Sequence, residues 1–425
     1  MNQSDSERII AILEKAGLTL SSEKEAGILI ANVCSVRQRA MDRVYALVDK
    51  WHKQKGVKIV LTGCILEKDK KMLRNKVHDI IPINKIGSLA NVIRKSEERK
   101  LCLLEKSYLE IRPKHQNSFS AYVPIMTGCN NFCAYCVVPY ARGCEISRPA
   151  GKIIREVQDL VKNGYKEIIL LGQNVNSYRF KLKFKNEKLK TTTKNLKSID
   201  FPRLLKIIDA VSGNFWIRFI TSHPKDMSDK LINTIAQCKK VCEYIHLPIQ
   251  SGDDEILKKM NRKYTVKHYL NLVKKIQAKI PNVAISTDVI VGFPGETKKQ
   301  FENTVRVMKK VKFDMAYIAQ YSPRPGTAAA KFKDDIPSQE KKRRYTILNK
   351  LLEKIIEEKN KKLVGEELDV LAERCTKSYC FGKTRKFKNV RFNNPPISPY
   401  QGGIFVKVKI VKAGAWGLEG TSTLS

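Results

Sequence analysis

Short apolar segments that end in a cysteine, a glycine or a polar residue recur along this chain, separated by amphipathic segments. Between 123 and about 333 the apolar segments are KEIILLGQN, FWIRFITSHP, EYIHLPIQSG, AISTDVIVGFPGE and DMAYIAQYSPRPG. Helical patterns such as KIIREVQDLVKN and TVKHYLNLVKKIQAKI lie between them. This alternation is typical of a parallel α/β barrel whose site is built by the loops that follow the strands. We therefore expect an α/β fold with a partial barrel here.

The first hundred residues repeat the alternation on a smaller scale. SDSERIIAILEKA (4–16) is predicted to be a helix that Ser4 and Glu7 begin as a capping box. GILIANVC and VKIVLTGC are predicted strands that end at Cys34 and Cys64, with a helical segment between them. Both cysteines should then lie at the carboxyl edge of one parallel sheet, where such folds place their sites. No strand precedes the first helix, so one βα unit lacks its first half.

Three further segments indicate the domain organisation. IRPKHQNSFSAY (111–122) has the composition of a linker, and 179–198 is predicted to be an exposed loop because it carries eight Lys/Arg against one Glu. A long helix is expected over 338–362, followed by short strands with turn glycines that are typical of a small β-barrel. We predict three domains, at 1–107, 118–350 and 360–425.

The charge of the chain restricts its partners. Eighty Lys+Arg against 42 Asp+Glu give a net charge of +38, and such a surface attracts nucleic acid before other partners. No segment is apolar enough to span a membrane, and no secretory signal pattern opens the chain. Eleven cysteines in a chain this large and basic do not suggest a disulfide scaffold. We expect a cytoplasmic protein whose cysteines are free thiols or metal ligands.

The segment TGCNNFCAYC places three cysteines, Cys129, Cys133 and Cys136, within eight residues. Structural zinc with Cys144 as a fourth thiolate is one interpretation, although zinc sites usually combine two cysteine pairs. Three unligated cysteines are another. The more specific hypothesis is a 4Fe–4S cluster held by three thiolates, which leaves one iron open to bind and act on a second molecule.

The loop CNNFCAYC matches the CxxxCxxC loop of the radical S-adenosylmethionine enzymes. MTGCNNFCAYCVVPYARGCEISRP, LLGQNVNSY, HLPIQSGDDEILKKMNRKYT, DVIVGFPGET and YSPRPGT together resemble the tRNA branch of the methylthiotransferase family, over nearly the whole chain. The resemblance implies an enzyme that adds a methylthio group to C2 of isopentenyl-adenosine beside the anticodon. It also implies two molecules of S-adenosylmethionine per turnover. One methylates a cluster-bound sulfur, and the other yields a 5′-deoxyadenosyl radical that takes hydrogen from the adenine carbon.

The resemblance implies roles for particular residues. Cys129, Cys133 and Cys136 would hold the radical cluster, and Cys34 and Cys64 would help hold a second 4Fe–4S cluster that carries the sulfur. The family's remaining cysteine sits in a GCQMN segment, and this chain opens at the Met of that segment. We therefore expect a start assigned too late, in preference to a truncated gene or a substitute such as Cys102. Contacts with S-adenosylmethionine or the adenosine are expected at Gly172, Gln173, Asn174, Gln250, Gly292, Gly295 and Glu296.

Other residues near these motifs have less specific expectations. Arg142 and Arg148 flank the cysteine loop and could pair with a carboxylate or phosphate, or simply be solvated. His223 and His246 have no second histidine at ligand spacing, so neither is expected to bind metal. The family pattern gives no role to a further set of cysteines, which we expect to be unligated thiols: Cys144, Cys238, Cys242, Cys375 and Cys380.

The C-terminal tail resembles the TRAM domain, an RNA-binding β-barrel. Its FGKTRKFKNVRF stretch would place alternating basic and aromatic residues on one strand, suited to RNA contact, although a solvated edge strand would look similar. We expect a monomer whose partners are tRNA, a reducing electron-donor protein and a sulfur donor. One alternative is a sister methylthiotransferase that acts on threonylcarbamoyl-adenosine in tRNA or on a ribosomal protein aspartate. Another is a non-catalytic RNA-binding protein with a zinc-stabilised cysteine loop.

Overall fold

The computed structural model describes residues 1–35, 38–94, 107–181, 198–394 and 400–422, which divide into two compact units. The first unit comprises Met1–Gln116, Pro124–Arg148 and Ser322–Phe332. The second comprises Asn117–Val123, Pro149–Tyr321 and Lys333–Ser425. The cysteine loop thus belongs to the same unit as the N-terminal sheet, while the three domain boundaries drawn from the sequence stay a prediction.

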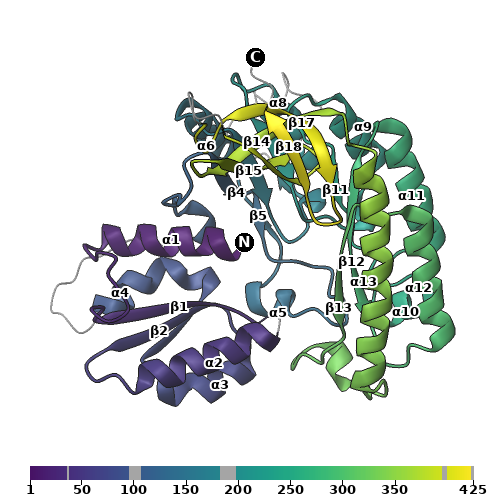
Figure 1. The fold of residues 1–425 in the computed structure, drawn as a ribbon. Helices are drawn as coiled ribbons and strands as arrows, with labels where there is room; N and C mark the ends of the chain where they lie inside the picture. Colours follow the sequence, from purple (N-terminus) through teal and green to yellow (C-terminus); the bar gives the residue numbers. More distant parts are fainter. Residues whose placement is uncertain (36–37, 95–106, 182–197, 395–399, 423–425) are drawn as a thin grey trace, which may run out of the picture. The chain divides into compact units, whose positions relative to one another are not determined.

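The first unit is built on a parallel sheet with the strand order β1-β2-β3, covered by helices on both faces (Figure 1). Its strands are β1 (Ile28–Cys34), β2 (Lys58–Cys64) and β3 (Asp79–Pro82). Its helices are α1 (Asn2–Lys15) and α4 (Leu89–Arg94) on one face, and α2 (Gln38–His52) and α3 (Glu67–Leu73) on the other. Two buried clusters, one around Ile9 and Val60 and one around Val48 and Leu61, fill the two layers. Helices on both faces explain why the strands are mostly apolar and do not alternate strictly between apolar and polar residues.

Shorter elements complete this unit. They are η1 (Arg74–Lys76), η2 (Ile83–Ser88), η3 (Tyr108–Glu110), β5 (Met126–Thr127), α5 (Val138–Arg142), β6 (Ile146–Ser147) and η6 (Ala328–Lys331).

Helix α1 begins at Asn2, before the predicted start, and the predicted capping box is wrong. Ser4 and Glu7 lie inside the helix and are buried, and no side chain caps its first turn. The Ser4 hydroxyl accepts a hydrogen bond from Arg8 Nη1 at 2.6 Å, and Glu7 Oε2 lies 3.3 Å from His115 Nδ1. Both polar side chains therefore bind other side chains, because the helix begins two residues earlier than the sequence pattern suggested.

The second unit contains the partial α/β barrel that the sequence predicts. Two three-stranded sheets, β10-β7-β4 and β11-β12-β13, are joined where Ile217 forms a parallel bridge with Val241. The strands are β4 (Ser120–Pro124), β7 (Glu167–Leu171), β10 (Trp216–Phe219), β11 (Tyr244–His246), β12 (Ala284–Val291) and β13 (Met315–Gln320). Each apolar segment singled out in the sequence contributes one of them.

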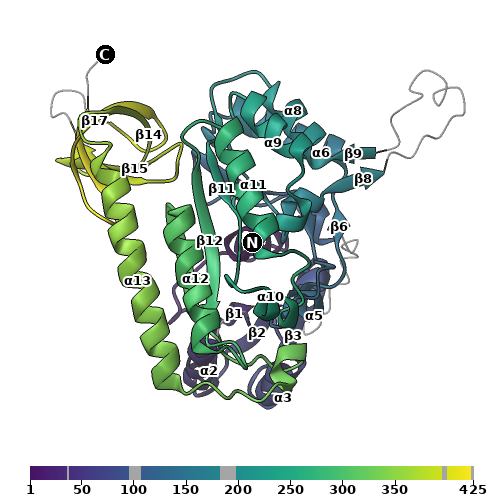
Figure 2. The same cartoon turned by 90° about the vertical axis from the view of Figure 1, so that its right-hand side faces the viewer.

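Helices alternate with these strands and cover the outside of the sheets (Figures 1 and 2). They are α6 (Ala150–Lys162), α8 (Phe201–Asp209), α9 (Asp229–Gln237), α10 (Asp254–Lys259), α11 (Val266–Lys279), α12 (Lys298–Val311), α13 (Ser338–Lys361), η4 (Val175–Ser177) and η5 (Pro224–Asp226). Helix α13 confirms the long helix expected near 338–362. Among the described residues, no helix is long and apolar enough to cross a membrane.

The basic segment predicted as a loop begins and ends in an antiparallel strand pair. Strand β8 (Arg179–Lys181) pairs with β9 (Ser198–Asp200), and the intervening 182–197 lie outside the described residues.

A closed barrel of strand order β14-β15-β16-β18-β17 ends the chain, as the sequence predicts, at the end of α13 (Figure 2). Its strands are β14 (Glu367–Cys375), β15 (Tyr379–Thr384), β16 (Asn389–Asn393), β17 (Phe405–Ala413) and β18 (Leu418–Ser422). The FGKTRKFKNVRF stretch is not one strand, so that prediction is wrong. It forms a hairpin whose turn contains Phe387 in the left-handed backbone region, with φ of 63°.

The turn of this hairpin rests on the partial barrel. Arg218 of β10 donates hydrogen bonds to the carbonyl oxygens of Thr384 and Arg385, both at 2.7 Å. Arg385 pairs in turn with Glu243 at 2.8 Å, and Trp216 packs on Phe405 with ring centroids 4.7 Å apart. The two barrels of this unit therefore share a packed and hydrogen-bonded boundary.

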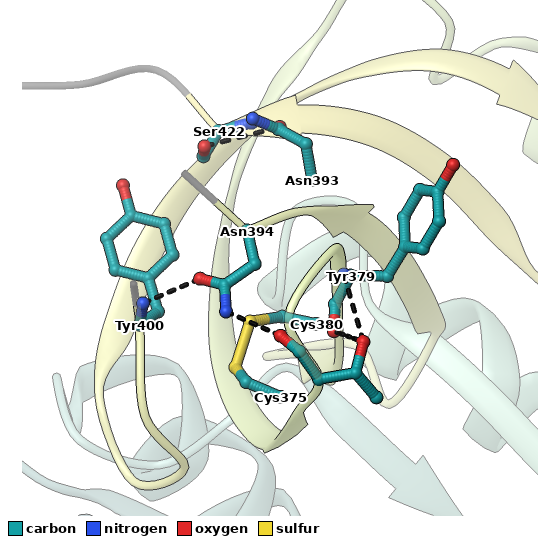
Figure 3. The surroundings of a disulfide bond; sticks show 8 residues. Cys375, Tyr379, Cys380, Asn393, Asn394, Tyr400 and Ser422 are labelled. Carbon is teal, nitrogen blue, oxygen red and sulfur yellow. Dashed lines mark hydrogen bonds between the residues drawn. A yellow bond between two sulfur atoms is a disulfide. The ribbon is translucent and has the colours of Figure 1, made fainter. Parts of the chain in front are cut away.

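The C-terminal barrel contains a disulfide bond between Cys375 and Cys380, drawn in Figure 3. The two residues are directly opposite in the antiparallel pairing of β14 and β15. Asn394 braces the intervening turn, since its Nδ2 donates to the Thr376 carbonyl at 2.7 Å. The prediction of free thiols at these two positions is wrong, because the hairpin register brings them face to face.

Candidate functional site

The three cysteines of TGCNNFCAYC lie on a tightly curled loop of the first unit. The Cys136 amide donates to the Cys133 carbonyl at 2.9 Å, and the Cys129 amide donates to the Gly143 carbonyl at 3.2 Å. Phe132 between them has a φ of 47°, a backbone conformation that is uncommon for a residue with a side chain. Such outliers concentrate at functional sites, so the loop shape itself supports a binding role.

Close backbone packing holds the two ends of this loop together. A Cβ atom on Gly128 would lie 1.9 Å from the Cys144 carbonyl oxygen, so only glycine fits there. The Cys129 thiol is half-buried, and this burial raises its pKa. Within the described ranges, no three His, Cys, Asp or Glu side chains are gathered closely enough to hold an ion. Metal ligation by Cys129, Cys133 and Cys136 stays a prediction.

Cys34 and Cys64 are direct neighbours in the parallel pairing of β1 and β2. This register confirms that both cysteines lie at the carboxyl edge of one sheet. A Cβ on Gly63 would lie 2.3 Å from the Val33 carbonyl oxygen, so the glycine before Cys64 permits this close approach. Burial raises the pKa of the Cys64 thiol to about 11.

A buried ion pair lies beside Cys64. Arg142 Nη2 donates to Asp5 Oδ2 at 2.5 Å, and the Tyr108 hydroxyl donates to Asp5 Oδ1 at 2.6 Å. The positive charge of Arg142 lowers the pKa of the Cys64 thiol and so opposes the larger effect of burial. Of the two environments considered for Arg142, pairing with a carboxylate is confirmed. Arg148 is likewise buried, with Nη1 3.4 Å from the Pro124 carbonyl oxygen.

In the second unit, Gly172, Gln173 and Asn174 follow β7 at its carboxyl end. The Gly172 carbonyl accepts from the Thr221 hydroxyl at 3.0 Å, and Asn174 Nδ2 donates to Asp226 at 2.6 Å. Three buried acceptors in this region have no hydrogen-bond partner among the described residues: Asn174 Oδ1, Asn176 Oδ1 and Ser222 Oγ. Each such atom costs about 1–3 kcal/mol. Unsatisfied polar atoms at strand ends therefore suit a polar ligand.

Gln250 lies beyond β11 and has a left-handed backbone, with φ of 70°. Its amide donates to the Asp288 carbonyl at 2.9 Å, and its carbonyl accepts from the Ile290 amide at 2.9 Å. These two bonds to β12 fix an unfavourable conformation. The buried side chain is thereby oriented, although its contact with a cosubstrate stays a prediction.

Gly292, Gly295 and Glu296 form the turn between β12 and α12. Glu296 is 1% exposed, and its Oε2 accepts from the Gly292 amide and from Arg344, both at 2.7 Å. Burial raises the pKa of this carboxyl group. A Cβ on Gly292 would lie 2.4 Å from Lys341 Cγ. Glu296 thus orders the turn through protein contacts, and a cofactor contact for these three residues stays a prediction.

Sequence reasoning missed a polar chain on one face of the β11-β12-β13 sheet. His246 Nδ1 lies 2.9 Å from Ser286 Oγ, and His246 Nε2 lies 3.2 Å from Asp288 Oδ2. The Ser286 hydroxyl continues the chain to the Tyr244 hydroxyl at 2.6 Å. The signal was present, because Ser286 and Asp288 interrupt an apolar strand at alternate positions and so share one face.

The remaining candidates take structural positions. His223 is buried beside Arg262, and burial together with that cation lowers its pKa to about 2. Cys144 is exposed, whereas Cys238 and Cys242 are buried thiols. Cys102 lies outside the described residues.

Family models match two parts of the chain. The model described as the Radical SAM superfamily matches residues 123–308, which include the cysteine loop. The model of an uncharacterized protein family, UPF0004, matches residues 1–82, which include both sheet-edge cysteines.

Curated relatives match almost the whole chain. A tRNA-2-methylthio-N(6)-dimethylallyladenosine synthase of Clostridium botulinum (strain Langeland) is 41% identical over 439 residues, covering 99% of this chain and 94% of the relative. A synthase of the same name from Dictyoglomus thermophilum is 40% identical over 437 residues, covering 99% and 96%.

Among solved structures, the radical S-adenosylmethionine methyltransferase TsrM of Kitasatospora setae, with cobalamin and a 4Fe–4S cluster bound, has a TM-score of 0.53. It is 12% identical and covers 76% of this chain and 73% of its own. At that identity the likeness concerns the fold alone.

Proposed function

This chain belongs to the family of tRNA-2-methylthio-N(6)-dimethylallyladenosine synthases, and from that premise we propose that it adds a methylthio group to C2 of isopentenyl-adenosine beside the anticodon of tRNA. The observation that carries the proposal is 41% identity over 99% of the chain. The Radical SAM match over residues 123–308 supports the reaction class.

Cys129, Cys133 and Cys136 would hold the radical cluster. Three thiols in one curled loop fit a 4Fe–4S cluster, because thiolate sulfur is the ligand that such clusters take in proteins. With S-adenosylmethionine bound, a cluster of this kind supplies a carbon-centred radical that removes hydrogen from the substrate. The left-handed Phe132 backbone and the turn from Cys133 to Cys136 would present the sulfurs on one side of the loop.

The strand ends of the second unit would bind the cosubstrate. The unsatisfied oxygens of Asn174, Asn176 and Ser222 would accept hydrogen bonds from its polar groups. Gln250 has a backbone held in an unfavourable conformation, which supports a contact with cosubstrate or adenosine. The same edge of the sheets would be formed by the residues that follow β7 and β12, namely Gly172, Gln173, Gly292, Gly295 and Glu296.

Cys34 and Cys64 would hold a second cluster that provides the sulfur. Their register across β1 and β2 supports a shared ligand set. The family pattern completes such a set with a third cysteine. The guanidinium of Arg142 beside Cys64 would balance the negative charge of the thiolates.

The C-terminal barrel would act as an RNA-binding TRAM domain. Arg391 lies over the half-exposed Tyr379 ring and Arg374 over the Phe381 ring, both 5.0 Å from the ring centroid. Such pairs suit phosphate contact and base stacking, and the net charge of +38 favours tRNA as the partner. We place the protein in the cytoplasm as a monomer, supplied by a reducing electron-donor protein and a sulfur donor.

Nucleoside mass spectrometry tests the reaction. Expression in a host that lacks the endogenous enzyme should restore 2-methylthio-isopentenyl-adenosine in its tRNA. Cys133→Ser should abolish this product, whereas Cys144→Ser should preserve it, because Cys144 is a ligand only in the zinc interpretation. A methylthiolated threonylcarbamoyl-adenosine in place of the expected nucleoside would assign the chain to the sister reaction.

Metal analysis tests the cysteine assignments independently of activity. After anaerobic reconstitution, about eight irons with matching sulfide would mean that both cysteine sets hold clusters. About four irons would mean that only the Cys129–Cys136 loop does. Stoichiometric zinc without iron would overturn the radical mechanism.

A further inference from the structure

A cavity of about 120 Å³ opens in the second unit, lined by the β11-β13 sheet, helix α13 and the C-terminal barrel. Four aromatic side chains from these elements line it: Tyr244, Tyr317, Phe387 and Trp416. We propose that this cavity binds a nucleobase of the tRNA other than the adenosine that is modified. The proposal rests on the tRNA-modifying function and adds a second base-recognition site to it.

Trp416 is the most exposed of these rings. It lies in the tight turn between β17 and β18, which a hydrogen bond from the Gly414 amide to the Gly417 carbonyl closes at 3.0 Å. Trp416 is 52% exposed, so folding leaves about half of this large residue in contact with water. Stacking with a base would remove the rest from water.

The backbone that carries Trp416 is anchored. Asn360 of α13 donates hydrogen bonds from Nδ2 to the Gly414 carbonyl at 2.8 Å and to the Ala415 carbonyl at 3.3 Å. The indole is therefore held beside the cavity by a side chain of a different element. A preorganised wall of this kind reduces the entropy lost on binding.

The other walls are also fixed before any ligand arrives. The Tyr244 and Phe387 rings pack with centroids 5.0 Å apart, and Phe387 holds the left-handed turn that rests on the partial barrel. Tyr317 is 45% exposed, which leaves a further ring open to a ligand. Flat aromatic surfaces around a small volume favour a flat π-system as the occupant.

Three charged side chains also line the cavity, Lys386, Lys388 and Asp314, and together they carry one net positive charge. Lys386 and Lys388 both line the cavity, and Lys388 Nζ is held 2.8 Å from Asn360 Oδ1 and 3.5 Å from Asp314 Oδ1. Lysines beside stacking rings are the combination that binds single-stranded nucleic acid, since phosphates flank every base. An apolar protein segment would instead have to remove water from the charge of Lys386, while Lys388 is already largely buried and paired with Asp314.

Tryptophan fluorescence gives a direct test, because the three tryptophans differ in exposure. Trp51 and Trp216 are 6% and 5% exposed against 52% for Trp416, so a neutral quencher such as acrylamide reports chiefly on Trp416. Saturating the full chain with the anticodon stem-loop RNA should lower the quenching constant at least about twofold. An unchanged quenching constant in the RNA-bound protein would overturn the proposal.

An abasic scan of the same stem-loop identifies the base. Removing the base that enters the cavity should weaken the binding of the RNA to the wild type about tenfold. The same removal should not weaken the binding of the RNA to Trp416→Ala any further. Trp416→Phe should retain most of the affinity because it keeps a stacking ring. Val411→Ala is the matched control, since Val411 is 54% exposed on the neighbouring strand and lies outside the cavity lining.

The outcomes separate this proposal from the proposed function. If the stem-loop does not bind the wild type at all, the tRNA-modifying function itself is contradicted. If the RNA binds and is methylthiolated, but Trp416→Ala binds every abasic RNA as the wild type does, the second base site is wrong. Circular dichroism of each variant shows whether it is folded. The quenching measurement uses the wild-type protein and therefore does not depend on the folding of a variant.

Discussion

The molecule contains two pairs of cysteines in which the two members lie opposite one another on neighbouring strands. The surroundings of the two pairs differ. Cys34 and Cys64 are paired at the ends of parallel strands and keep free thiols. Cys375 and Cys380 are paired across antiparallel strands and form a disulfide. Register alone therefore does not determine what a cysteine pair does.

The neighbours of each pair account for the difference. Beside Cys64 lies a buried cation, Arg142, whose charge lowers the pKa of that thiol against the larger effect of burial. Cys375 and Cys380 flank a tight turn and have Cα atoms 4.0 Å apart, and Asn394 donates to the Thr376 carbonyl within that turn. The same residue type is thus a candidate ligand at the edge of the N-terminal sheet and a covalent link in the C-terminal barrel.

The largest expected effect concerns the ion pair beside the first cysteine pair. Arg142→Ala leaves the Asp5 carboxylate buried without its cation, so the free energy of unfolding should fall by about 3–5 kcal/mol. Urea denaturation measures it. Lys114→Ala, which removes an exposed pair with Glu14 in the same unit, should change it by less than about 1 kcal/mol. Equal midpoints for Arg142→Ala and the wild type would show that this edge is not organised around a buried ion pair.

A smaller effect is expected at the second pair. Reduction of the disulfide, or Cys375→Ser, should destabilise the C-terminal barrel by about 2 kcal/mol, because the bond closes a short loop and constrains the unfolded chain only modestly. Hydrogen exchange of the β14 and β15 amides, followed by mass spectrometry, reports this locally. Cys34→Ser should leave that exchange unchanged. Identical protection with and without reductant would argue that the bond contributes nothing to the barrel.

The smallest expected effect is a loss of folding stability at alkaline pH. In the metal-free protein the pKa of Cys64 is about 11, against an ordinary value of 9.0, so the unfolded chain loses this proton first. The associated stability is complete well below pH 9 and is lost as the pH rises toward 11, by about 1.4 kcal/mol at pH 10. Cys64→Ala should abolish its share of the loss between pH 8 and pH 10. Cys144→Ala, which removes an exposed thiol, is the matched control and should leave that loss in place, and a reversed pattern would contradict the assignment.

The sequence predicts what repeats with the period of a strand or a helix. Apolar runs ending in Cys34 and Cys64 were sufficient to place both at one sheet edge, and the same logic located the partial barrel and α13. The polar contacts of Asp288 were not predicted, although Ser286 and Asp288 are two residues apart in β12 and so lie on the same face of the strand.

Contacts between distant segments carry no such signal. Asp5 and Arg142, which form an ion pair, are 137 positions apart in the sequence. Ser4 has the sequence pattern of a helix cap, but in the structure its hydroxyl accepts a hydrogen bond from Arg8. The Cys375–Cys380 bond depends on a hairpin register that the composition of the tail does not reveal. Burial and tertiary partners, which determine these features, appear only once the chain is folded.

The hydrogen bonds of Arg218 limit how freely the C-terminal barrel can be exchanged between relatives. Its guanidinium is buried and divides its donors between Glu167 and the carbonyl groups of Thr384 and Arg385. A chain cut after α13 would leave two of those donors unmet and would uncover Trp216. In protein engineering this barrel therefore cannot be removed or exchanged by itself. A chimera must take the matching residues of β10 from the same relative as the hairpin that rests on them.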